Sequence, residues 1–410
     1  MNEIFRIALR NLSRQRRRTG LTVSIIAFGV IAVILFSSLA GSFKNMMISQ
    51  ITDSMLGHLQ IHRAGYVESL DTMPLNLMIE EAGLAEIEKV LKETPEIEGY
   101  SLRILLATLL SNYLDTTNIK LSAISPESER VVTPLLDGRI TKGKFLQSGE
   151  ILLPNLVARG LDIGVGSEAV VIATNVDGSV NGTSLVVSGI VETTVGPSGK
   201  YGYIHLDDAR NLLRMESAQV SEIAVRLTNI DSMTKVMQKL KKALAEIKDD
   251  KGRPRYEIHP WKALSPFNNI AVMIDLMTIF IQIILVTIVL ISIMNVMLMA
   301  VYERTKEIGT IAAIGTQPST IMGLFISEGL FLGIFGALLG NIVGVVLVYA
   351  VKAAQLTVSF GQSDNILLSP AVSASTMFWT SIIVVIITLL GAIEPAWKAS
   401  RLDPVEALRN

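Results

Sequence analysis

TGLTVSIIAFGVIAVILFSSLAGSF, residues Thr19–Phe43, contains no charged side chain. A helix needs about 20 apolar residues to cross the hydrocarbon core of a bilayer, so this stretch is long enough to span a membrane. Three more charge-free stretches follow much later in the chain: Leu276–Val301, Gly329–Val351 and Asn365–Ile393. The sequence between the first and the second is polar and rich in turn residues. This order predicts one membrane span, a large domain outside the lipid, and then three more spans.

The bulk composition also indicates a membrane protein. Hydrophobic residues make up 50% of the chain and charged residues only 18%, and the mean hydropathy is +0.48. With no cysteine, disulfide bonds are excluded. The formal net charge of -1 gives no reason to expect a nucleic-acid partner.

The distribution of basic residues predicts the orientation. Lysine and arginine next to membrane helices stay on the cytoplasmic side, so the N-terminus is expected in the cytoplasm. Four spans return the C-terminus to the same side, together with the loop after the second span.

The alternative, a signal peptide cleaved after Ala40, requires a shorter apolar stretch than the one at Thr19–Phe43, because signal sequences carry 7–15 apolar residues. Six arginines precede the first span: Arg6, Arg10, Arg14, Arg16, Arg17 and Arg18.

We therefore expect an α-helical membrane protein with four transmembrane helices and an extracytoplasmic α+β domain. The N-terminal segment 1–18 is expected to form an amphipathic helix in the membrane interface, with its arginines at the level of the headgroup phosphates. The remaining predicted segments are spans at 19–43, 266–301, 322–352 and 372–393, the outer domain at 44–265, a cytoplasmic loop at 302–321, an outer loop at 353–371 and a cytoplasmic tail at 394–410.

Two strand–helix–strand units are predicted in the outer domain, far apart in sequence. They indicate one α+β, porter-like subdomain of βαβ type, split by a small β subdomain inserted at about 131–220. Asp231 is expected to be the N-cap of the second helix. The predicted elements are strands at 59–63, 101–110 and 118–124 around a helix at 80–93, strands at 222–227 and 256–259 around a helix at 232–247, and inserted strands at 151–153, 168–174, 184–191 and 201–205.

Nothing in the sequence indicates an enzyme active site. There is no Ser/His/Asp or Cys/His arrangement, no phosphate-binding glycine loop and no pair of carboxylates in a recognisable motif. His58 and His62 have no acidic partner at metal-ligand spacing, so we interpret them as polar surface residues. Ser128–Glu129 and Asp207–Asp208 are interpreted as solvated loop and helix-cap residues. Catalytic, cofactor and metal sites are therefore not expected in this chain.

The most distinctive local motif is YERTKEIGTIAAIGT, residues 302–316. It begins with a dense charged turn, and two glycines then frame a short apolar run. These features predict a short helix that lies parallel to the membrane and fits a groove on a cytoplasmic partner. Glu328 follows near the cytoplasmic start of the third span, where a packing or loop-anchoring role is favoured over transport chemistry. The residues proposed for partner coupling are Glu303, Arg304, Lys306, Glu307, Gly309 and Gly315.

Glycines recur along the third span at spacings that let helices approach closely. They favour close packing within the bundle or a seam between two copies of the chain, and the sequence does not decide between the two. These glycines are Gly329, Gly333, Gly336, Gly340 and Gly344.

The ERTKEIG…IG run, followed by an acidic residue and glycines at the next span, resembles the signature of FtsX-like (MacB-type) ABC-transporter permeases. The C-terminal PAWKASRLDPVEALR, residues 395–409, is similar to the closing P-A-x-x-A-x-x-x-x-P-x-x-A-L-R of the same family. The resemblance covers the whole chain, including the one-plus-three arrangement of spans. One departure from the family pattern is Thr310-Ile311-Ala312-Ala313, where members often carry a basic residue just before the second glycine, so the detailed contacts with an ATPase are expected to differ here.

The resemblance implies a permease half in a bacterial inner membrane, with its large domain in the periplasm. It implies a second permease half, the same or a related chain, and a separate ABC ATPase that binds ATP and Mg²⁺, because this chain has no G-x-x-x-x-G-K-[ST] loop. Residues 303–316 would form the coupling helix on that ATPase. Members of this family usually transmit motion to the outer domain instead of enclosing a substrate tunnel, which agrees with spans that are nearly free of charge.

Three functions are compatible with the resemblance: release of lipoproteins to a periplasmic carrier, efflux of a drug, peptide or haem through a periplasmic adaptor, and FtsX-like signalling to a cell-wall hydrolase. GHLQIHRAGY, residues 57–66, resembles a region of lipoprotein-releasing permeases and favours the first. A receptor anchored by the spans is a further alternative, but it leaves the loop at 302–316 unexplained. Lipoprotein release predicts an apolar lipid entry near the outer leaflet, with Met46, Met47, Ile48, Met273, Ile274 and Met277 at that level.

Overall fold

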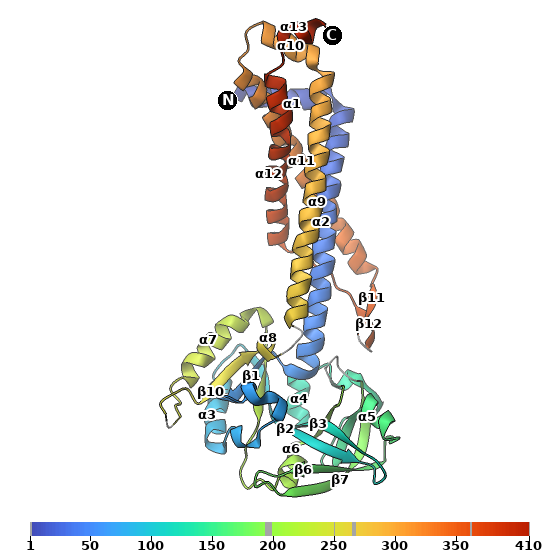
Figure 1. Ribbon diagram of the computed structural model, residues 1–410, viewed down its shortest axis with the longest axis vertical. Helices are drawn as coiled ribbons and strands as arrows, with labels where there is room; N and C mark the ends of the chain where they lie inside the picture. The colour runs from blue at the N-terminus through green and yellow to red at the C-terminus, as the bar shows by residue number, and fades with distance from the viewer. Residues whose placement is uncertain (1, 193–198, 250, 265–267, 361–362, 410) are drawn as a thin grey trace. The chain divides into compact units, whose positions relative to one another are not determined.

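The computed structural model of the chain describes residues 2–192, 199–249, 251–264, 268–360 and 363–409. The chain divides into two compact units. One is a helical bundle and the other is a mixed α/β domain (Figure 1). The bundle contains Met1–Asn45, Ala271–Thr357 and Leu367–Asn410, and the α/β domain contains Met46–Ile270 and Val358–Ile366.

Four helices within the described residues are long and apolar enough to cross a membrane: Arg16–Leu56, Asn268–Glu303, Pro318–Ala353 and Ala374–Ser400. The predicted fold class, four spans with an α/β domain between the first two, is confirmed. The expected boundary between residues 265 and 266 lies outside the described residues. The helices of the bundle are α1 (Asn2–Arg14), α2 (Arg16–Ile51), α9 (Asn268–Glu303), α10 (Thr305–Ala313), α11 (Pro318–Ala353), α12 (Ala374–Ser400) and α13 (Pro404–Arg409).

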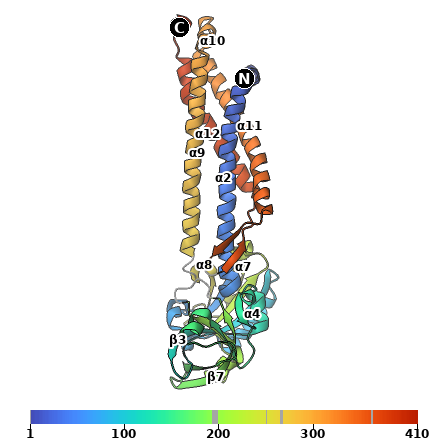
Figure 2. The ribbon, with the colours of Figure 1, turned by 90° about the vertical axis from the view of Figure 1, so that its right-hand side faces the viewer.

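The spans pack through small residues and branched aliphatic side chains. Gly29 on α2 faces Val289 on α9, and α11 lies on the other side of α2 from α9 (Figure 2). Helices α11 and α12 pack against each other along much of their length. Ile26, Val30, Ile34, Ile293, Leu332 and Val384 are among the residues that form the buried core.

A ten-stranded sheet runs through the α/β domain in the order β10-β1-β9-β2-β3-β8-β5-β7-β4, with β6 paired to β2 and β7. Both predicted strand–helix–strand units are present, and their strands meet because β1 lies between β9 and β10. The strands are β1 (Leu59–Arg63), β2 (Ile97–Ser111), β3 (Thr116–Ile124), β4 (Ile140–Gly143), β5 (Glu150–Pro154), β6 (Glu168–Thr174), β7 (Val180–Val191), β8 (Tyr201–His205), β9 (Glu222–Leu227) and β10 (Tyr256–Pro260).

Strand β2 joins the two halves of this sheet. Residues Ile97–Arg103 pair with β9, whereas Ile104–Ser111 pair with β3. The predicted β insertion is therefore present, but its strands continue the same hydrogen-bonded sheet through β2. A separate two-stranded sheet is formed by β11 (Thr357–Phe360) and β12 (Ser363–Leu367).

Short helices complete the α/β domain. The prediction that Asp231 caps the second helix is wrong, because a turn of 3₁₀ helix at Ile230–Ser232 precedes that helix. The Asn229 side chain accepts a hydrogen bond from the Asp231 backbone N–H, so Asn229 is the residue that caps the turn. The α-helices are α3 (Glu81–Lys92), α4 (Pro126–Val132), α5 (Asn155–Gly160), α6 (Leu206–Leu212), α7 (Met233–Leu244) and α8 (Trp261–Leu264).

Candidate coupling site

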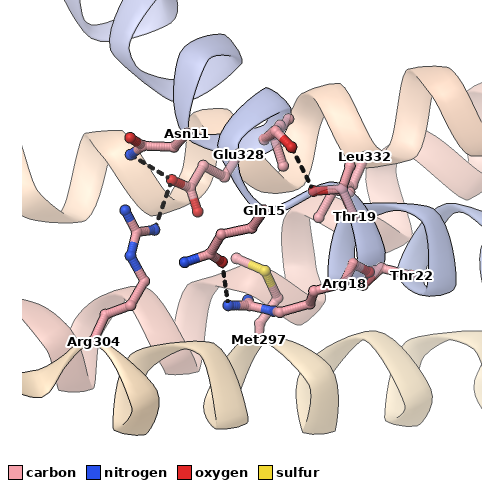
Figure 3. Close-up of a pocket in the computed structure, with 10 residues that line it drawn as sticks. Asn11, Gln15, Arg18, Thr19, Thr22, Met297, Arg304, Glu328 and Leu332 are labelled. Carbon is pink, nitrogen blue, oxygen red and sulfur yellow. Dashed lines mark hydrogen bonds and ion pairs between the residues drawn. The ribbon is translucent and has the colours of Figure 1, made fainter.

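Glu328 is a buried carboxylate on α11 that contacts two other segments of the bundle (Figure 3). Its Oε1 accepts a hydrogen bond from Asn11 Nδ2 of α1 at 2.9 Å and one from Arg304 Nη1 at 3.1 Å. Only 3% of the residue is exposed. A buried carboxylate is costly unless it is paired and hydrogen-bonded, and here both conditions are met. The contacts fix the N-terminal helix and the loop after α9 to one point on α11.

Arg304 separates α9 from α10 and pairs with two carboxylates. Besides Glu328, it contacts Glu307, where its Nε donates to Oε2 at 3.0 Å. Burial lowers the pKa of Arg304, but the charges of Glu328 and Glu307 outweigh burial and raise it above its ordinary value. The guanidinium therefore stays charged and holds the start of α10 against α11.

A second set of contacts stabilises the elbow between α1 and α2. Arg18 donates to Gln15 Oε1 at 3.1 Å, and its Nη1 lies 3.9 Å from Glu303 Oε2 at the end of α9. Thr19 Oγ1 donates to the Leu12 carbonyl at 2.9 Å. These side chains and those around Glu328 line a hollow of about 10 Å³, which is room for about one water molecule. The arrangement suits a mechanical junction better than a ligand pocket.

Helix α10 has one packed face and one exposed face. Gly309 lies against Ala407 of α13, because a Cβ added at Gly309 would lie 2.6 Å from the Ala407 Cβ. The other face is open: Ile314, at the end of α10, is 79% exposed and Ile311 is 40% exposed. Two large apolar side chains beside charged ones form a surface suited to a protein partner.

The predicted coupling residues divide between these two faces. Glu303, Lys306 and Glu307 are exposed, whereas Arg304 is partly buried against Glu328. Gly309 serves the packing of α13, and Gly315 ends the α10 segment with a φ of 93° that glycine adopts easily. The sequence did not indicate that Asn11 would contact Glu328 or that Ala407 would pack on Gly309, since only the fold brings these residues together.

The five glycines of α11 face two different neighbours. Gly329 and Gly333 contact Ala392 and Thr388 of α12. The other three contact α2, and a Cβ added at Gly340 would lie 2.5 Å from Val30 Cβ and 2.9 Å from the Ala27 carbonyl oxygen. All five therefore contribute to packing within one copy of the chain; the residue pairs on α2 are Gly336 with Ile26, Gly340 with Val30 and Gly344 with Ile34.

The residues proposed for a lipid entry differ in exposure. Met46 and Met47 are buried and Ile48 is partly buried, whereas Met273 and Met277 on α9 are more than half exposed and Ile274 is partly buried. In the bundle, Lys44 on α2 pairs with Asp275 on α9 at 2.6 Å. This ion pair joins the two spans beside Met273 and Ile274.

Buried polar contacts in the α/β domain correct three of our interpretations. Glu129 is only 1% exposed and accepts two hydrogen bonds from Arg103, so it is not a solvated loop residue. His62 is fully buried 3.4 Å from Glu222, which also accepts from Arg103 at 2.9 Å. His58 is buried too, and its Nδ1 accepts from the Leu227 backbone N–H. Each group is buried because the fold supplies a partner that the linear sequence does not reveal.

Two families match the chain. The FtsX-like permease C-terminal family matches residues 279–404, and the MacB-like periplasmic core domain family matches residues 19–243, more than half of the chain. The chain belongs to the MacB/FtsX-like family of ABC-transporter permeases. The predicted resemblance is thus confirmed. Arg304, Glu328 and α10 lie within the segment that the FtsX-like family matches, whereas Asn11 and Arg18 lie outside it.

Individual relatives differ in how much of the permease they cover. The lipoprotein-releasing system transmembrane protein LolC of Neisseria meningitidis is 26% identical over 433 residues, which is 98% of this chain and 98% of that protein. The macrolide export ATP-binding/permease protein MacB of Nitrobacter winogradskyi is 37% identical over 114 residues, 28% of this chain and 16% of that protein. The solved periplasmic region of MacB from Actinobacillus actinomycetemcomitans shares 13% identity, covers 51% of this chain and 92% of that one, and gives a TM-score of 0.37.

Proposed function

We propose that this permease is a membrane subunit of an ABC transporter that releases lipoproteins from the bacterial inner membrane. The observation that carries the proposal is the end-to-end similarity to a LolC protein, which covers 98% of both chains. The GHLQIHRAGY segment at residues 57–66 supports the same substrate class. The arginine-rich N-terminus supports a cytoplasmic location for that end, and with it a periplasmic location for the α/β domain.

The energy in this proposal comes from a separate ATPase that binds ATP and Mg²⁺ and docks on the exposed face of α10. Ile311 and Ile314 supply apolar contacts, and Lys306 and Glu307 supply charges at the rim. Movement of α10 passes through Arg304 to Glu328, and from there to α11 and, through Asn11, to α1. The glycine contacts between α11 and α2 carry the movement to the span that leads into the α/β domain.

Transport of an ion through the spans does not fit the distribution of charge. The central stretches of the four spans contain no charged residue, so they offer no path of carboxylates for an ion. Glu328 lies just before the third stretch, and its charge is paired with Arg304. A second permease half and a periplasmic carrier complete the proposed transporter. The carrier receives the lipoprotein after the α/β domain moves.

The test is to purify the full-length permease from its native membranes with its partners and to identify bound proteins by mass spectrometry. We expect an ABC ATPase together with lipoproteins, and we expect addition of ATP to release the lipoproteins. An ATPase with a periplasmic adaptor or outer-membrane channel, and no lipoprotein, would contradict the proposal and favour efflux. A Glu303→Lys/Glu307→Lys variant that inserts normally into the membrane but no longer co-purifies with the ATPase would show that the ATPase docks on the loop at residues 302–316.

A further inference from the structure

Helix α1 uses its apolar side to pack against α11. Phe5 meets Phe331 edge to face with ring centroids 6.0 Å apart, Ala8 is fully buried, and Asn11 reaches Glu328 from the same side. A free interfacial helix would insert this side into lipid. Because α11 already covers it, the opposite side of α1 is what remains open to the surroundings.

The open side carries arginines for which the described side chains provide no ion-pair partner. Arg6, Arg10 and Arg14 follow one another at intervals of four residues, which places them along one stripe of the helix, and all three are exposed. Among the described side chains, none of the three makes an ion pair, and neither do Arg16 and Arg17 at the start of α2. Like charges four residues apart destabilise a helix. A bound anion would remove this repulsion.

The position of the three arginines close to the first membrane span indicates which kind of anion binds them. The charge-free stretch begins at Thr19, five residues after Arg14, so at a rise of about 1.5 Å per residue the hydrocarbon region begins within about 8 Å of Arg14 along the chain. Ile7 and Leu9, about half exposed, flank the arginines and offer apolar contacts. A phospholipid presents a phosphate and acyl chains at this depth, whereas a soluble phosphate offers only the charge.

We propose that the open side of α1, centred on Arg6, Arg10 and Arg14, binds anionic phospholipid in preference to zwitterionic phospholipid. The guanidinium groups contact the phosphate and the negatively charged headgroup, and Ile7 and Leu9 contact the start of an acyl chain. The same helix presents Asn11 to Glu328, so bound lipid and the candidate coupling site share one element. The proposal does not depend on which substrate is transported.

The absence of cysteine allows a clean test on the full-length permease. A single Ser13→Cys, at an exposed position of α1 that is not assigned a lipid contact, carries a fluorophore. The protein is placed in phosphatidylcholine nanodiscs, and quenching is measured with spin-labelled phosphatidylglycerol or spin-labelled phosphatidylcholine. We expect roughly hundredfold stronger association with phosphatidylglycerol, since each of the three arginines near an anionic surface changes the affinity about fivefold. We also expect the preference to shrink at high salt.

Three sets of substitutions make the test specific. Arg6→Gln/Arg10→Gln/Arg14→Gln should abolish the preference. The corresponding change of all three to Lys should keep most of it, because lysine and arginine are attracted to an anionic surface about equally. A matched loss of three charges on α7, Lys235→Gln/Lys241→Gln/Lys242→Gln, should change nothing. Equal quenching by the two lipids in the parent protein, or a preference that survives the three Gln substitutions, would overturn the proposal. Full displacement by inorganic phosphate would also overturn it, by indicating a site for soluble anions. None of these measurements requires ATP hydrolysis, so their outcome does not depend on whether the permease releases lipoproteins.

Discussion

Glu328 connects segments that are separated by more than 300 residues in the sequence, since its hydrogen-bond partner Asn11 is 317 positions away. Its place beside the third span predicted an anchoring role, because a lone carboxylate near a span is expected to be paired. The identity of the partners was not predictable. Arg304 was within the recognised motif, but Asn11 belongs to an amphipathic helix with several polar side chains, and the sequence gives no reason to choose among them.

Replacing Glu328 with Gln should destabilise the bundle by about 3–5 kcal/mol, because Arg304 then stays buried with one of its two carboxylates removed. Thermal unfolding of the detergent-solubilised permease measures the loss. The control is Glu394→Gln, which breaks an exposed i,i+4 pair with Lys398 on α12. Exposed pairs contribute at most about 1 kcal/mol, so the control should leave the unfolding temperature nearly unchanged. Equal losses of thermal stability in the two variants would contradict the role of Glu328 as a buried anchor of the bundle.

The cluster around Arg103 shows where residue-level prediction failed. Arg103 and Glu222 lie within predicted strands, and they face each other in the register between β2 and β9. Charged residues in otherwise apolar strands were the available signal. Without the register the sequence could not pair them, and without the pairing an exposed position remained the better prediction for Glu129 and His62.

Acid should weaken the α/β domain partly through Glu222. Burial raises the pKa of Glu222, but the hydrogen bond from His62 and the charge of Arg103 outweigh burial and hold the pKa below its ordinary value of 4.5. The folded state then binds fewer protons than the unfolded state, so this contribution to stability is complete above pH 4.5 and is lost as the pH falls through the folded-state pKa.

The Glu222→Gln variant should therefore unfold at a lower temperature at pH 7 and should lose less of its remaining stability than the parent between pH 4.5 and pH 3. Tryptophan fluorescence during heating measures both quantities, with Glu257→Gln on the exposed side of β10 as the control. Parallel acid profiles for the parent and Glu222→Gln would show that Glu222 does not have a depressed pKa.

At the scale of elements, the sequence predicted most helices and strands of the α/β domain because their apolar residues recur at intervals typical of each structure. The sequence could not predict that β2 would join both halves of the sheet. Strands at 101–110 and 222–227 were assigned separately, and the pairing between them depends on contacts across more than 100 residues. The glycine pattern on α11 likewise predicted close packing but not its two neighbours, α2 and α12.

The glycine contact between α11 and α2 can be tested within one helix. Gly340→Ala places a Cβ 2.5 Å from Val30 Cβ and 2.9 Å from a backbone oxygen, so the helices must move apart, at a cost of about 1–3 kcal/mol. Gly323→Ala is the matched control on α11, since the nearest atom to its added Cβ is the Ile4 side chain at 3.9 Å. We expect the control to be neutral or slightly stabilising, because alanine favours helix more than glycine. A Gly340→Ala protein with unchanged thermal stability would contradict the close contact.

For the whole molecule, the order of apolar stretches was enough to predict one span, an α/β domain and three spans, because membrane crossing depends mainly on the length and polarity of a segment. The loop after α9 was predicted to meet a partner because it combines dense charge with an apolar run. The fold adds that this loop is held by Glu328 on one side and by α13 on the other. An element fixed in this way transmits a displacement to the spans, whereas a free loop would absorb it.

The rate of ATP hydrolysis by the permease and its partner ATPase, reconstituted together in nanodiscs, tests the central claim most directly. The comparison is between the parent chain, Glu303→Lys/Glu307→Lys in the α10 loop, and Glu81→Lys/Glu86→Lys on α3 as a control with the same change of charge. We predict that the loop variant inserts and folds normally but loses at least nine-tenths of the transport-linked hydrolysis, while the α3 variant keeps it. Undiminished hydrolysis in the loop variant would contradict the assignment of α10 as the site where the motor drives the permease.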